Sequence, residues 1–572
     1  MPEHGDNNGT IPALLVSGVS GSSGKTLVSL GLARALVRKG ISVQPYKKGP
    51  DYIDSAWLSA ACGRSCACLD PFFMNDDELK RHFRRYARGL CLIEGNRGFY
   101  DGSDIHGSSS TSRLAKLLDV PVVLVLSCSK MTRTAAALLF GMACFETGFN
   151  WAGVVLNRMG SARHAALTRK CIEEHTPFKV LGVLPRLRES PIPERHLGLS
   201  FSPCGSQQCL SALEKAADFI EENTDLTSHD FLNTIPGFSF PYSHEDAGQP
   251  SAVWDGGKNI GSSEPQICLS QELQPVSRHH GHAEQENSAS VSSCVRNTAP
   301  ESFRIAGCGN GMEALEISHD SGMTLQRESG PSIGFVYDDA LWFYYRENLE
   351  ALREAGAKLV RLSLLGDGQW PEGLDGLYLG GGYPELFAEA LSKNGRLDAI
   401  RRYSEDGMPI YAECGGFMLL SASLDLEQDS IPGQETSSQP MTGVFPSEIV
   451  FTAKPVGLGY CEGTVIRTNP YFGLGTVIRG HEFHYSYMKP LAGKEDFVLS
   501  LRKGHGMCKE GNRRDGLIKN RTFASYMHIF APSDPGWAEN FVKACSDYIK
   551  EKERRQEQVR QCGTTTGLSQ GS

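Results

Sequence analysis

The chain has 572 residues, of which 40% are hydrophobic and 22% charged, a balance typical of a soluble globular protein of several domains. The net charge of −9 disfavours a nucleic-acid-binding protein, because such proteins usually carry a basic surface. No apolar run approaches the ~18 residues of a membrane span, and the N-terminus lacks the pattern of a secretion signal. Seventeen cysteines spread through both halves indicate a reducing compartment, so we expect a cytoplasmic protein without membrane partners.

The first half alternates short apolar runs with segments of helical periodicity, from residue 11 to about residue 235. A helix is predicted over residues 26–40, ending at Gly40. Continuous Val, Ile and Leu strands that alternate with helices indicate a parallel sheet buried on both faces. The predicted strands are IPALLVSGV (11–19), ISVQPYK (41–47), LCLIEG (90–95), VPVVLVL (120–126) and WAGVVLN (151–157).

The composition changes to Ser, Gly, Gln, His, Asn and Pro over residues 236–329. Such a segment buries too little apolar surface to offset its ordering entropy, so it is predicted to be a mostly disordered linker or insertion.

The second half, residues 330–550, returns to the α/β pattern, and a flexible tail is expected over 551–572. A helix is predicted over 345–357 and a last one from Gly536 onward. The chain therefore reads as two α/β domains, 11–235 and 330–550, joined by the insertion. The predicted strands here are PSIGFVYDDA (331–340), KLVRLSLL (358–365), GLYLGGG (376–382), PIYAEC (409–414) and RTFASYMHIF (521–530).

A phosphate-binding loop, GVSGSSGKT, runs from Gly18 to Thr26 between the first strand and the first helix. Five residues separate Gly18 from Gly24, one more than in the usual P-loop, so the motif is a variant. Small residues let backbone N–H groups surround an anion at a helix N-terminus, Lys25 adds a positive charge, and the Thr26 hydroxyl suits Mg²⁺. A Gly/Ser-rich turn without a ligand is the alternative interpretation.

Acidic residues follow the next two strands. Asp51 and Asp54 come after the second strand, Glu94 ends the third, and Asp101 follows in GNRGFYDG. Ligands bind at the carboxyl ends of strands in open α/β sheets, so these acids suit Mg²⁺ ligation and ordering of water around a phosphoryl group. For Asp51 and Asp54, the alternative is an Asp-rich turn with a capping residue.

A candidate nucleophile, Cys414, lies between a strand and a helix in PIYAECGGFMLL. Two glycines after it permit a tight turn, and a thiol at a helix N-terminus is expected to have a lowered pKa. The glycines at 380–382 are candidates for an oxyanion hole. A buried, inert cysteine is the alternative. The base is left open by spacing alone, with three candidates: His481, His484 and His528.

Together these segments resemble the cobyrinic acid a,c-diamide synthase family over residues 11–235 and 331–548. The shared motifs are GVSGSSGKT, KGPDYID, EGNRGFYDG, LNR with a later RHLGL, FYYRENL, GGGYPE, ECGGFM and SYMH. The resemblance implies a dethiobiotin-synthetase-like P-loop domain followed by a class I glutamine amidotransferase domain. It also implies amidation of the a and c carboxylates of a tetrapyrrole with ATP, Mg²⁺ and ammonia from glutamine, through an acyl phosphate.

Two alternatives stay open beside that resemblance. The nickel-sirohydrochlorin a,c-diamide synthases share most of these motifs, so sirohydrochlorin or nickel-sirohydrochlorin is the rival substrate. A non-catalytic, ATP-dependent regulatory protein on the same fold is the other alternative. The expected partners are the tetrapyrrole acid, glutamine and ATP, with a homodimer as a further candidate and no nucleic acid.

The resemblance also implies residue roles. The base is His528, and Phe530 stands where many class I glutaminases carry a Glu, so a Cys–His pair without a third carboxylate is expected. Departures from the family pattern at Asn96, Arg97 and Ser127 put the substrate, and full activity, in question. The implied sites are: catalytic, Cys414 and His528; oxyanion, Gly381 and Gly382; ATP, Gly18, Gly21, Gly24, Lys25, Thr26 and Asn157; substrate and phosphoryl group, Asp51, Tyr52, Asp54, Glu94 and Asp101; Mg²⁺, Thr26, Asp51 and Glu94.

Overall fold

The computed structural model describes residues 10–192, 207–240, 330–426, 437–491, 496–534 and 536–565. The described residues of both predicted domains belong to one compact unit. The RHLGL motif, residues 241–329 of the predicted insertion and residues 566–572 of the predicted tail lie outside the described residues.

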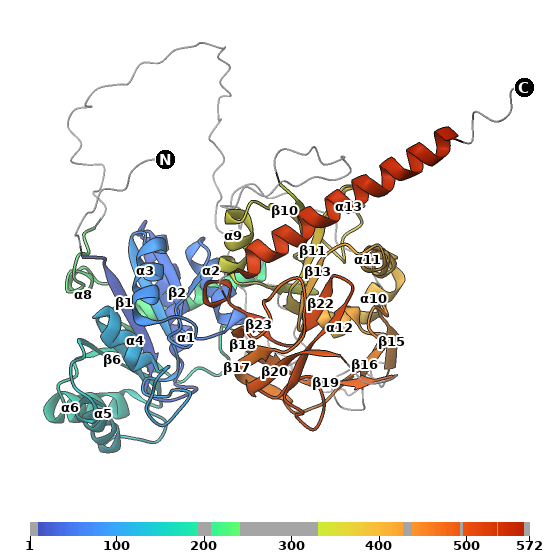
Figure 1. The fold of residues 1–572 in the computed structure, drawn as a ribbon. Helices are drawn as coiled ribbons and strands as arrows, with labels where there is room; N and C mark the ends of the chain where they lie inside the picture. Colours follow the sequence, from blue (N-terminus) through green and yellow to red (C-terminus); the bar gives the residue numbers. More distant parts are fainter. Residues whose placement is uncertain are drawn as a thin grey trace, which may run out of the picture. The chain divides into compact units, whose positions relative to one another are not determined.

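The N-terminal domain contains a seven-stranded sheet in which every neighbouring pair of strands is parallel (Figure 1). Alternate residues of β1 enter different cores: Leu15 packs on one face of the sheet, and Leu14 and Val16 pack on the other. The predicted buried parallel sheet is thereby confirmed. In spatial order the strands are β3 (Ala67–Cys68), β2 (Val43–Lys47), β4 (Leu90–Gly98), β1 (Ala13–Gly18), β5 (Val122–Ser127), β6 (Trp151–Met159) and β7 (Val180–Pro185).

Helices connect these strands, as parallel strands require. The phosphate loop joins β1 to α1, so it lies at the carboxyl end of a central strand. The helices are α1 (Lys25–Arg38), α2 (Tyr52–Cys62), α3 (Asp76–Tyr86), α4 (Thr111–Leu118), α5 (Arg133–Phe145), α6 (Ala162–His175), α7 (Gln207–Asn223) and α8 (His229–Leu232).

The C-terminal domain is built on a ten-stranded mixed sheet, parallel from β10 to β22 and antiparallel beyond. In spatial order its strands are β10 (Lys358–Leu362), β8 (Ser332–Val336), β11 (Gly376–Leu379), β13 (Ile410–Glu413), β22 (Thr522–Ser525), β21 (Arg514–Lys519), β20 (Phe497–Lys503), β17 (Gly457–Val465), β18 (Val477–His484) and β23 (His528–Ile529). Smaller sheets pair β9 (Leu341–Phe343) with β12 (Gly381–Gly382), and order β15 (Ser437–Pro440), β14 (Ser423–Leu426), β16 (Ser447–Phe451) and β19 (Ser486–Pro490).

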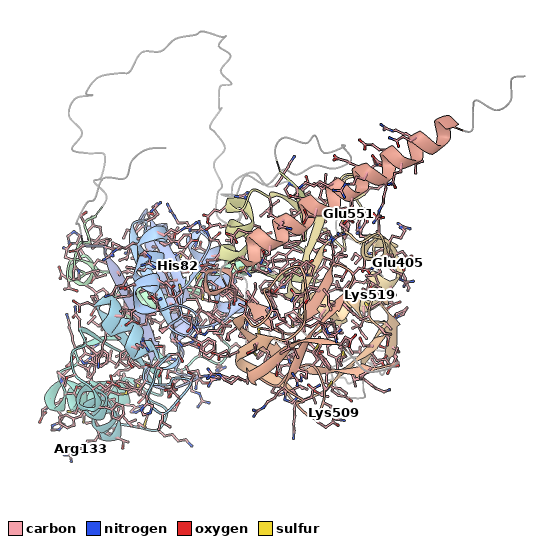
Figure 2. The ribbon with its side chains drawn as sticks, viewed as in Figure 1. His82, Arg133, Glu405, Lys509, Lys519 and Glu551 are labelled. Atoms are coloured by element: carbon pink, nitrogen blue, oxygen red, sulfur yellow. The ribbon has the colours of Figure 1, made fainter. Side chains whose placement is uncertain are left out.

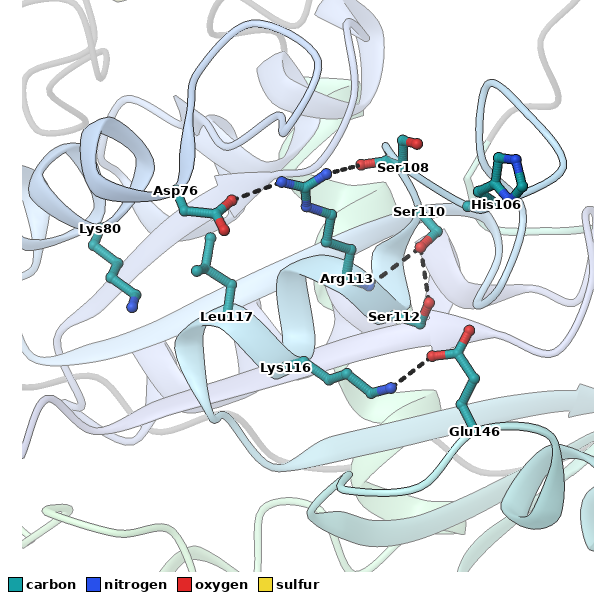
Figure 3. Close-up of a pocket in the computed structure, with 11 residues that line it drawn as sticks. Asp76, Lys80, His106, Ser108, Ser110, Ser112, Arg113, Lys116, Leu117 and Glu146 are labelled. Atoms are coloured by element: carbon teal, nitrogen blue, oxygen red, sulfur yellow. Dashed lines mark hydrogen bonds and ion pairs between the residues drawn. The ribbon is translucent and has the colours of Figure 1, made fainter.

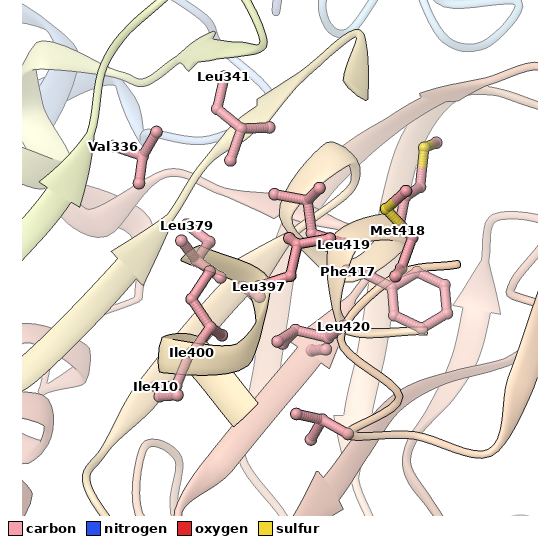
Figure 4. Packing of buried hydrophobic residues seen from close by; sticks show 14 of the residues in the cluster. Val336, Leu341, Leu379, Leu397, Ile400, Ile410, Phe417, Met418, Leu419 and Leu420 are labelled. Carbon is pink, nitrogen blue, oxygen red and sulfur yellow. The ribbon is translucent and has the colours of Figure 1, made fainter. Parts of the chain in front are cut away.

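The short helix α12 (Gly415–Leu420) is buried along its whole length. Its residues Phe417 to Leu420 belong to the same buried apolar core as Leu379, Ile400 and Ile410, shown in Figure 4, so the helix is fixed by packing. The remaining helices are α9 (Arg346–Glu354), η2 (Pro384–Phe387), α10 (Ala388–Lys393), α11 (Arg396–Glu405), η3 (Ala531–Ser533) and α13 (Trp537–Thr565).

The segment RTFASYMHIF does not form the single strand that its composition predicts. The carboxylate of Asp515 accepts hydrogen bonds from the backbone N–H groups of Tyr526 and Met527, both at 3.0 Å. These bonds occupy the N–H groups that would extend β22. The chain leaves the sheet there and forms β23, which places His528 opposite His481 of β18.

The last helix also differs from expectation, because α13 continues beyond residue 550 to Thr565. Glu551, labelled in Figure 2, pairs with Arg521 at 2.6 Å and with Arg555 one turn farther along the helix at 3.8 Å. Spacing of i,i+4 for opposite charges supports a polar helix. Across the described part of the chain, no helix combines the length and apolarity that a membrane crossing needs.

Candidate active site

The phosphate loop carries left-handed backbone at Ser22 (φ 57°) and Gly24 (φ 92°). Such a turn directs successive N–H groups into one concavity, which suits an anion. A Cβ at Gly24 would lie 2.1 Å from Asn157 Nδ2, so only glycine fits there. Asn157 Nδ2 donates to the Ser23 carbonyl at 2.9 Å. In this structure Asn157 therefore supports the loop.

A buried cluster of charges lies next to this loop. Glu94 Oε1 accepts hydrogen bonds from Lys25 Nζ (3.1 Å), Thr26 Oγ1 (2.9 Å) and Lys47 Nζ (3.0 Å). Lys47 also donates to Asp54 Oδ2 at 2.7 Å. The structure thus brings together four of the residues expected from sequence, Lys25, Thr26, Asp54 and Glu94, and adds Lys47.

Lys47 is the member of this cluster that the sequence analysis missed. Its side chain is fully buried at the end of β2. Burial acts to lower the pKa of Lys47, but the carboxylates of Asp54 and Glu94 outweigh it, so the pKa is raised and the ammonium stays charged. The sequence signal that could have indicated Lys47 is a lysine at the end of the second strand, two residues before GPD.

Two of the expected acids make local contacts. Asp51 caps α2, its Oδ1 accepting from the Asp54 N–H at 3.0 Å. Asp101 accepts from the Gly98 N–H at 2.8 Å and is exposed. The capping interpretation of Asp51 therefore describes one of its contacts.

The residues present fit a magnesium–nucleotide complex. Glu94 Oε2 is buried and has no hydrogen-bond partner among the described residues, although it lies beside a lysine and a threonine hydroxyl. The described residues contain no group of three or more His, Cys, Asp or Glu side chains arranged for a metal. Mg²⁺ that is shared with phosphates needs only one or two protein carboxylates, so Thr26 and Glu94 are sufficient.

The departures from the family pattern lie around the same site. A Cβ at Gly49 would approach Asn96 Nδ2 at 2.5 Å, so Asn96 packs closely against the KGPDYID segment. Arg97 has φ 51° and is exposed. Ser127 pairs with Asn157 between β5 and β6. An effect of the three on activity stays a prediction.

The second site is a strained turn, Cys414–Gly416, which we call the cysteine elbow. Cys414 has φ 47° and ψ −102°, and its N–H donates to the Ser525 carbonyl at 2.7 Å. Gly416 N–H donates to the Gly380 carbonyl at 2.9 Å, so the glycine loop 380–382 packs directly against the elbow. A Cβ at Gly416 would lie 2.3 Å from the Leu379 carbonyl oxygen, which explains the glycine.

The expectation of a lowered pKa for the Cys414 thiol is wrong for this structure. Burial raises its pKa first, and the neighbouring carboxyl of Glu385 raises it further, while the Gly415 N–H opposes them. Helix α12 has only six residues, so its dipole is small beside the cost of burying a thiolate. The Cys414 thiol is therefore protonated in the free site.

His528 lies near a carboxylate that the sequence analysis did not expect, although its Nδ1 has no hydrogen-bond partner among the described residues. Its Nδ1 lies 3.6 Å from Glu413 Oε2, and Glu413 directly precedes the nucleophile. The other edge of the ring faces the glycine loop, because a Cβ at Gly381 would lie 3.2 Å from His528 Nε2. Whether Glu413 acts with the expected pair of Cys414 and His528 stays a prediction. Position 530 gave no hint, because the acid comes from the strand of the nucleophile.

The other two histidines have different surroundings. The His481 ring stacks on His528 with centroids 4.8 Å apart, and burial lowers its pKa, followed by the neighbouring His528, so it is neutral. His484 Nδ1 donates to the Ser486 carbonyl at 2.7 Å, and its ring stacks on Tyr526.

A buried acid, Glu385, lies next to the elbow. It belongs to η2, directly after the glycine loop, and burial raises its pKa to about 8. Its neighbours Cys414 and Tyr526 have raised pKa values, chiefly through burial, and stay neutral at physiological pH. Glu385 therefore titrates near neutral pH.

We expect Glu385→Gln to gain stability over the wild type as pH rises. The pKa of this carboxyl is raised from 4.5 to about 8, so between these values the folded chain holds a proton that the unfolded chain has lost. Stability then falls with rising pH by about 1.4 kcal/mol per unit, and glutamine removes this loss. Denaturant unfolding from pH 5 to pH 9 measures the free energy of unfolding of both proteins. The advantage of Glu385→Gln over the wild type should grow up to pH 8 and then stay constant. A flat difference, like that expected for exposed Glu389→Gln, would contradict the assignment.

Tyr52 of the N-terminal domain contacts His481 and His528 of the C-terminal domain. The Tyr52 ring of α2 stacks on Phe343 (5.1 Å, 5°) and contacts His528 (5.2 Å), His481 (5.4 Å) and Tyr345 (4.8 Å). Its hydroxyl is buried without a partner among the described residues. Tyr52, expected at the substrate site, therefore lies against residues of the second domain.

A separate pocket lies beside the start of α4 (Figure 3). Its cations are mostly paired, Arg113 with Asp76 at 2.8 Å and Lys116 with Glu146 at 2.7 Å. None of the site residues expected from sequence lines this pocket, so it is distinct from the phosphate loop and from the elbow.

Comparison with known proteins identifies both domains. Residues 14–199 match the CobQ/CobB/MinD/ParA nucleotide binding domain, and residues 332–535 match the CobB/CobQ-like glutamine amidotransferase domain. The expected fold class, a P-loop domain followed by an amidotransferase domain, is thereby confirmed.

Relatives align over nearly the whole chain. A cobyrinate a,c-diamide synthase of Magnetococcus marinus is 34% identical over 92% of this chain and 96% of its own length. The enzyme of the same name from Methanosphaera stadtmanae is 32% identical, over 93% of this chain and 98% of its own. That of Caldanaerobacter subterraneus subsp. tengcongensis is also 32% identical, over 93% and 98%.

Proposed function

Since the chain belongs to the cobyrinate a,c-diamide synthase family, we propose that it amidates the a and c carboxylates of a cobyrinate-type tetrapyrrole. It is a glutamine-hydrolysing carbon–nitrogen ligase with a nucleotide-binding domain. The observation that supports the proposal most is the presence in one compact unit of two complementary sites. One is a phosphate loop with the Lys25–Glu94–Lys47 cluster, and the other is a cysteine elbow packed on the glycine loop that His528 faces.

The P-loop domain activates the substrate carboxylate. A carboxylate oxygen attacks the γ-phosphorus of ATP, ADP leaves, and an acyl phosphate forms. Lys25 neutralises charge on the transferred phosphoryl group, and Lys47 holds Glu94 and Asp54 in place by hydrogen bonds. Bound Mg²⁺, held by Thr26 and Glu94, supplies further charge neutralisation at the phosphates.

The second domain supplies ammonia. His528 takes the proton of the Cys414 thiol, the thiolate attacks the side-chain amide carbon of glutamine, and His528 delivers that proton to the departing ammonia. Water then hydrolyses the thioester to glutamate and restores the thiol. Ammonia attacks the acyl phosphate, loses a proton and displaces phosphate, giving the amide. A path shielded from water keeps ammonia unprotonated.

We place this chemistry in the cytoplasm. Buried cysteines such as Cys62, Cys91 and Cys128 are present as thiols, which agrees with a reducing compartment. A homodimer is the candidate assembly, testable by light scattering.

The proposed function is tested by product analysis. The purified chain is incubated with ATP, Mg²⁺ and glutamine, and with cobyrinic acid, sirohydrochlorin or nickel-sirohydrochlorin in separate reactions. Mass spectrometry should find a diamide of cobyrinic acid together with ADP, phosphate and glutamate. A diamide formed only from a sirohydrochlorin would reassign the substrate, and nucleotide binding without any amide would favour a regulatory protein.

A further inference from the structure

We propose that Glu385 binds the α-ammonium group of glutamine and so selects α-amino acid amides for the cysteine elbow. This inference rests on the proposed glutaminase activity of the second domain.

The first support is the state of the Glu385 side chain. The residue is 8% exposed, and its Oε2 is buried with no hydrogen-bond partner among the described residues. Four residues farther on, Glu389 is exposed and pairs with Lys393 at 2.6 Å. The contrast sets Glu385 apart from the surface acids of the same segment, because a buried carboxylate without a partner is costly to retain.

The second support is its position. Glu385 lies three residues after Gly382, the last glycine of the loop. Both Gly382 and Pro384 lie next to the elbow, because a Cβ at Gly415 would be 2.8 Å from the Gly382 nitrogen and 3.1 Å from Pro384 Cδ. The charge of Glu385 acts on the Cys414 thiol. The unpartnered oxygen therefore belongs to the surroundings of the nucleophile.

The chemistry of the substrate identifies the missing partner. Free glutamine carries one cationic group, the α-ammonium, which bears three donors and suits a carboxylate acceptor. The ammonium would complete the hydrogen bonding of Glu385 and keep it ionised. An amide that lacks the α-amino group would leave Glu385 unpaired, and a site built for a polar group rejects such analogues strongly.

Pairing would also act on the nucleophile. Where Glu385 is ionised, its negative charge disfavours the thiolate of Cys414, and an adjacent ammonium offsets that charge. Bound substrate therefore removes this obstacle to ionisation of the thiol.

The test compares two amides in the full-length chain. Glutamine and 4-carbamoylbutanoate, which is glutamine without its α-amino group, are hydrolysed by wild type, Glu385→Gln and Glu385→Asp, with Glu389→Gln as the matched control. For Glu385→Gln, kcat/KM for glutamine should fall about 100-fold, mostly through KM, as for loss of a buried charge pair. The value for 4-carbamoylbutanoate should change less than about threefold, because that amide lacks the ammonium partner. Glu385→Asp keeps the charge and should keep part of the preference for glutamine.

Other outcomes are separable. An equal loss on both amides would make Glu385 structural, and an unchanged preference would assign the ammonium to another group; either overturns the inference. The hydrolysis assay contains no ATP and no tetrapyrrole, so failure of the proposed amidation would show only in the product assay.

Discussion

Cys414→Ser is expected to abolish glutamine-dependent amidation, with a loss of at least about three powers of ten, and to leave ammonia-dependent amidation largely intact. Cys414 is the residue of the strand–Gly–Gly–helix elbow, held at φ 47° beside the glycine loop. Serine has nearly the same size, but its hydroxyl has a far higher pKa, and the proposed base His528 would have to ionise it in a buried site. The phosphate loop uses no thiol, so external ammonia at high concentration and raised pH can still attack the activated carboxylate.

The measurement is the amount of amide formed with glutamine and then with ammonium chloride. Cys461→Ser is the matched control, since Cys461 is another fully buried thiol of the same domain that lies away from the elbow. If both activities of Cys414→Ser fell together, the residue would be structural or the two sites would be tightly coupled. If glutamine-dependent activity survived, another nucleophile would carry the reaction.

Lys25→Ala should remove amidation with either nitrogen source, by at least about 100-fold. Both sources depend on the same activated carboxylate, whose formation requires charge neutralisation at the phosphates. Lys25 Nζ also lies 3.1 Å from Glu94 and 3.9 Å from Asp54, so the substitution removes one positively charged partner from each of these acids. Glutamine hydrolysis, measured without ATP, should persist because its residues lie in the other domain.

Lys39→Ala serves as control, because Lys39 caps the opposite end of the same helix and pairs with Glu221. Its amidation rate should match that of the wild type. Near wild-type amide formation from ammonia in Lys25→Ala would show that the phosphate-loop assignment is wrong.

The features that could be predicted are those that a short stretch of sequence determines. The order of apolar strands and helices indicated the parallel sheet, and GKT and ECGG each placed a functional residue between a strand and a helix. The elbow and the phosphate loop are turns whose glycines are required locally, so their sequences reveal them.

What escaped prediction depends on contacts between distant segments. Lys47 pairs with Glu94 across neighbouring strands. Glu413 lies near His528 because the Ile529 N–H of β23 donates to Glu413 Oε1 at 3.1 Å. The split between β22 and β23 arises from Asp515, a residue of another strand. The raised pKa of Cys414 is an effect of burial, which a helix-start pattern does not measure.

The contacts of Tyr52 with the second domain limit how the domains of such enzymes can be exchanged. The residue follows the cap of α2 and precedes Asp54 by two positions, so the ring that rests on His528 and Phe343 is rigidly tied to the acid beside Lys25. An amidotransferase domain taken from another enzyme would need an aromatic pocket for this ring, like the one formed here by Phe343, Tyr345, His481 and His528. Without it, the Tyr52 ring would clash with the new domain. Exchange of domains between such ligases is therefore limited by the fit of the Tyr52 ring. If the two domains were separated, the pocket that this ring fills would be exposed to water.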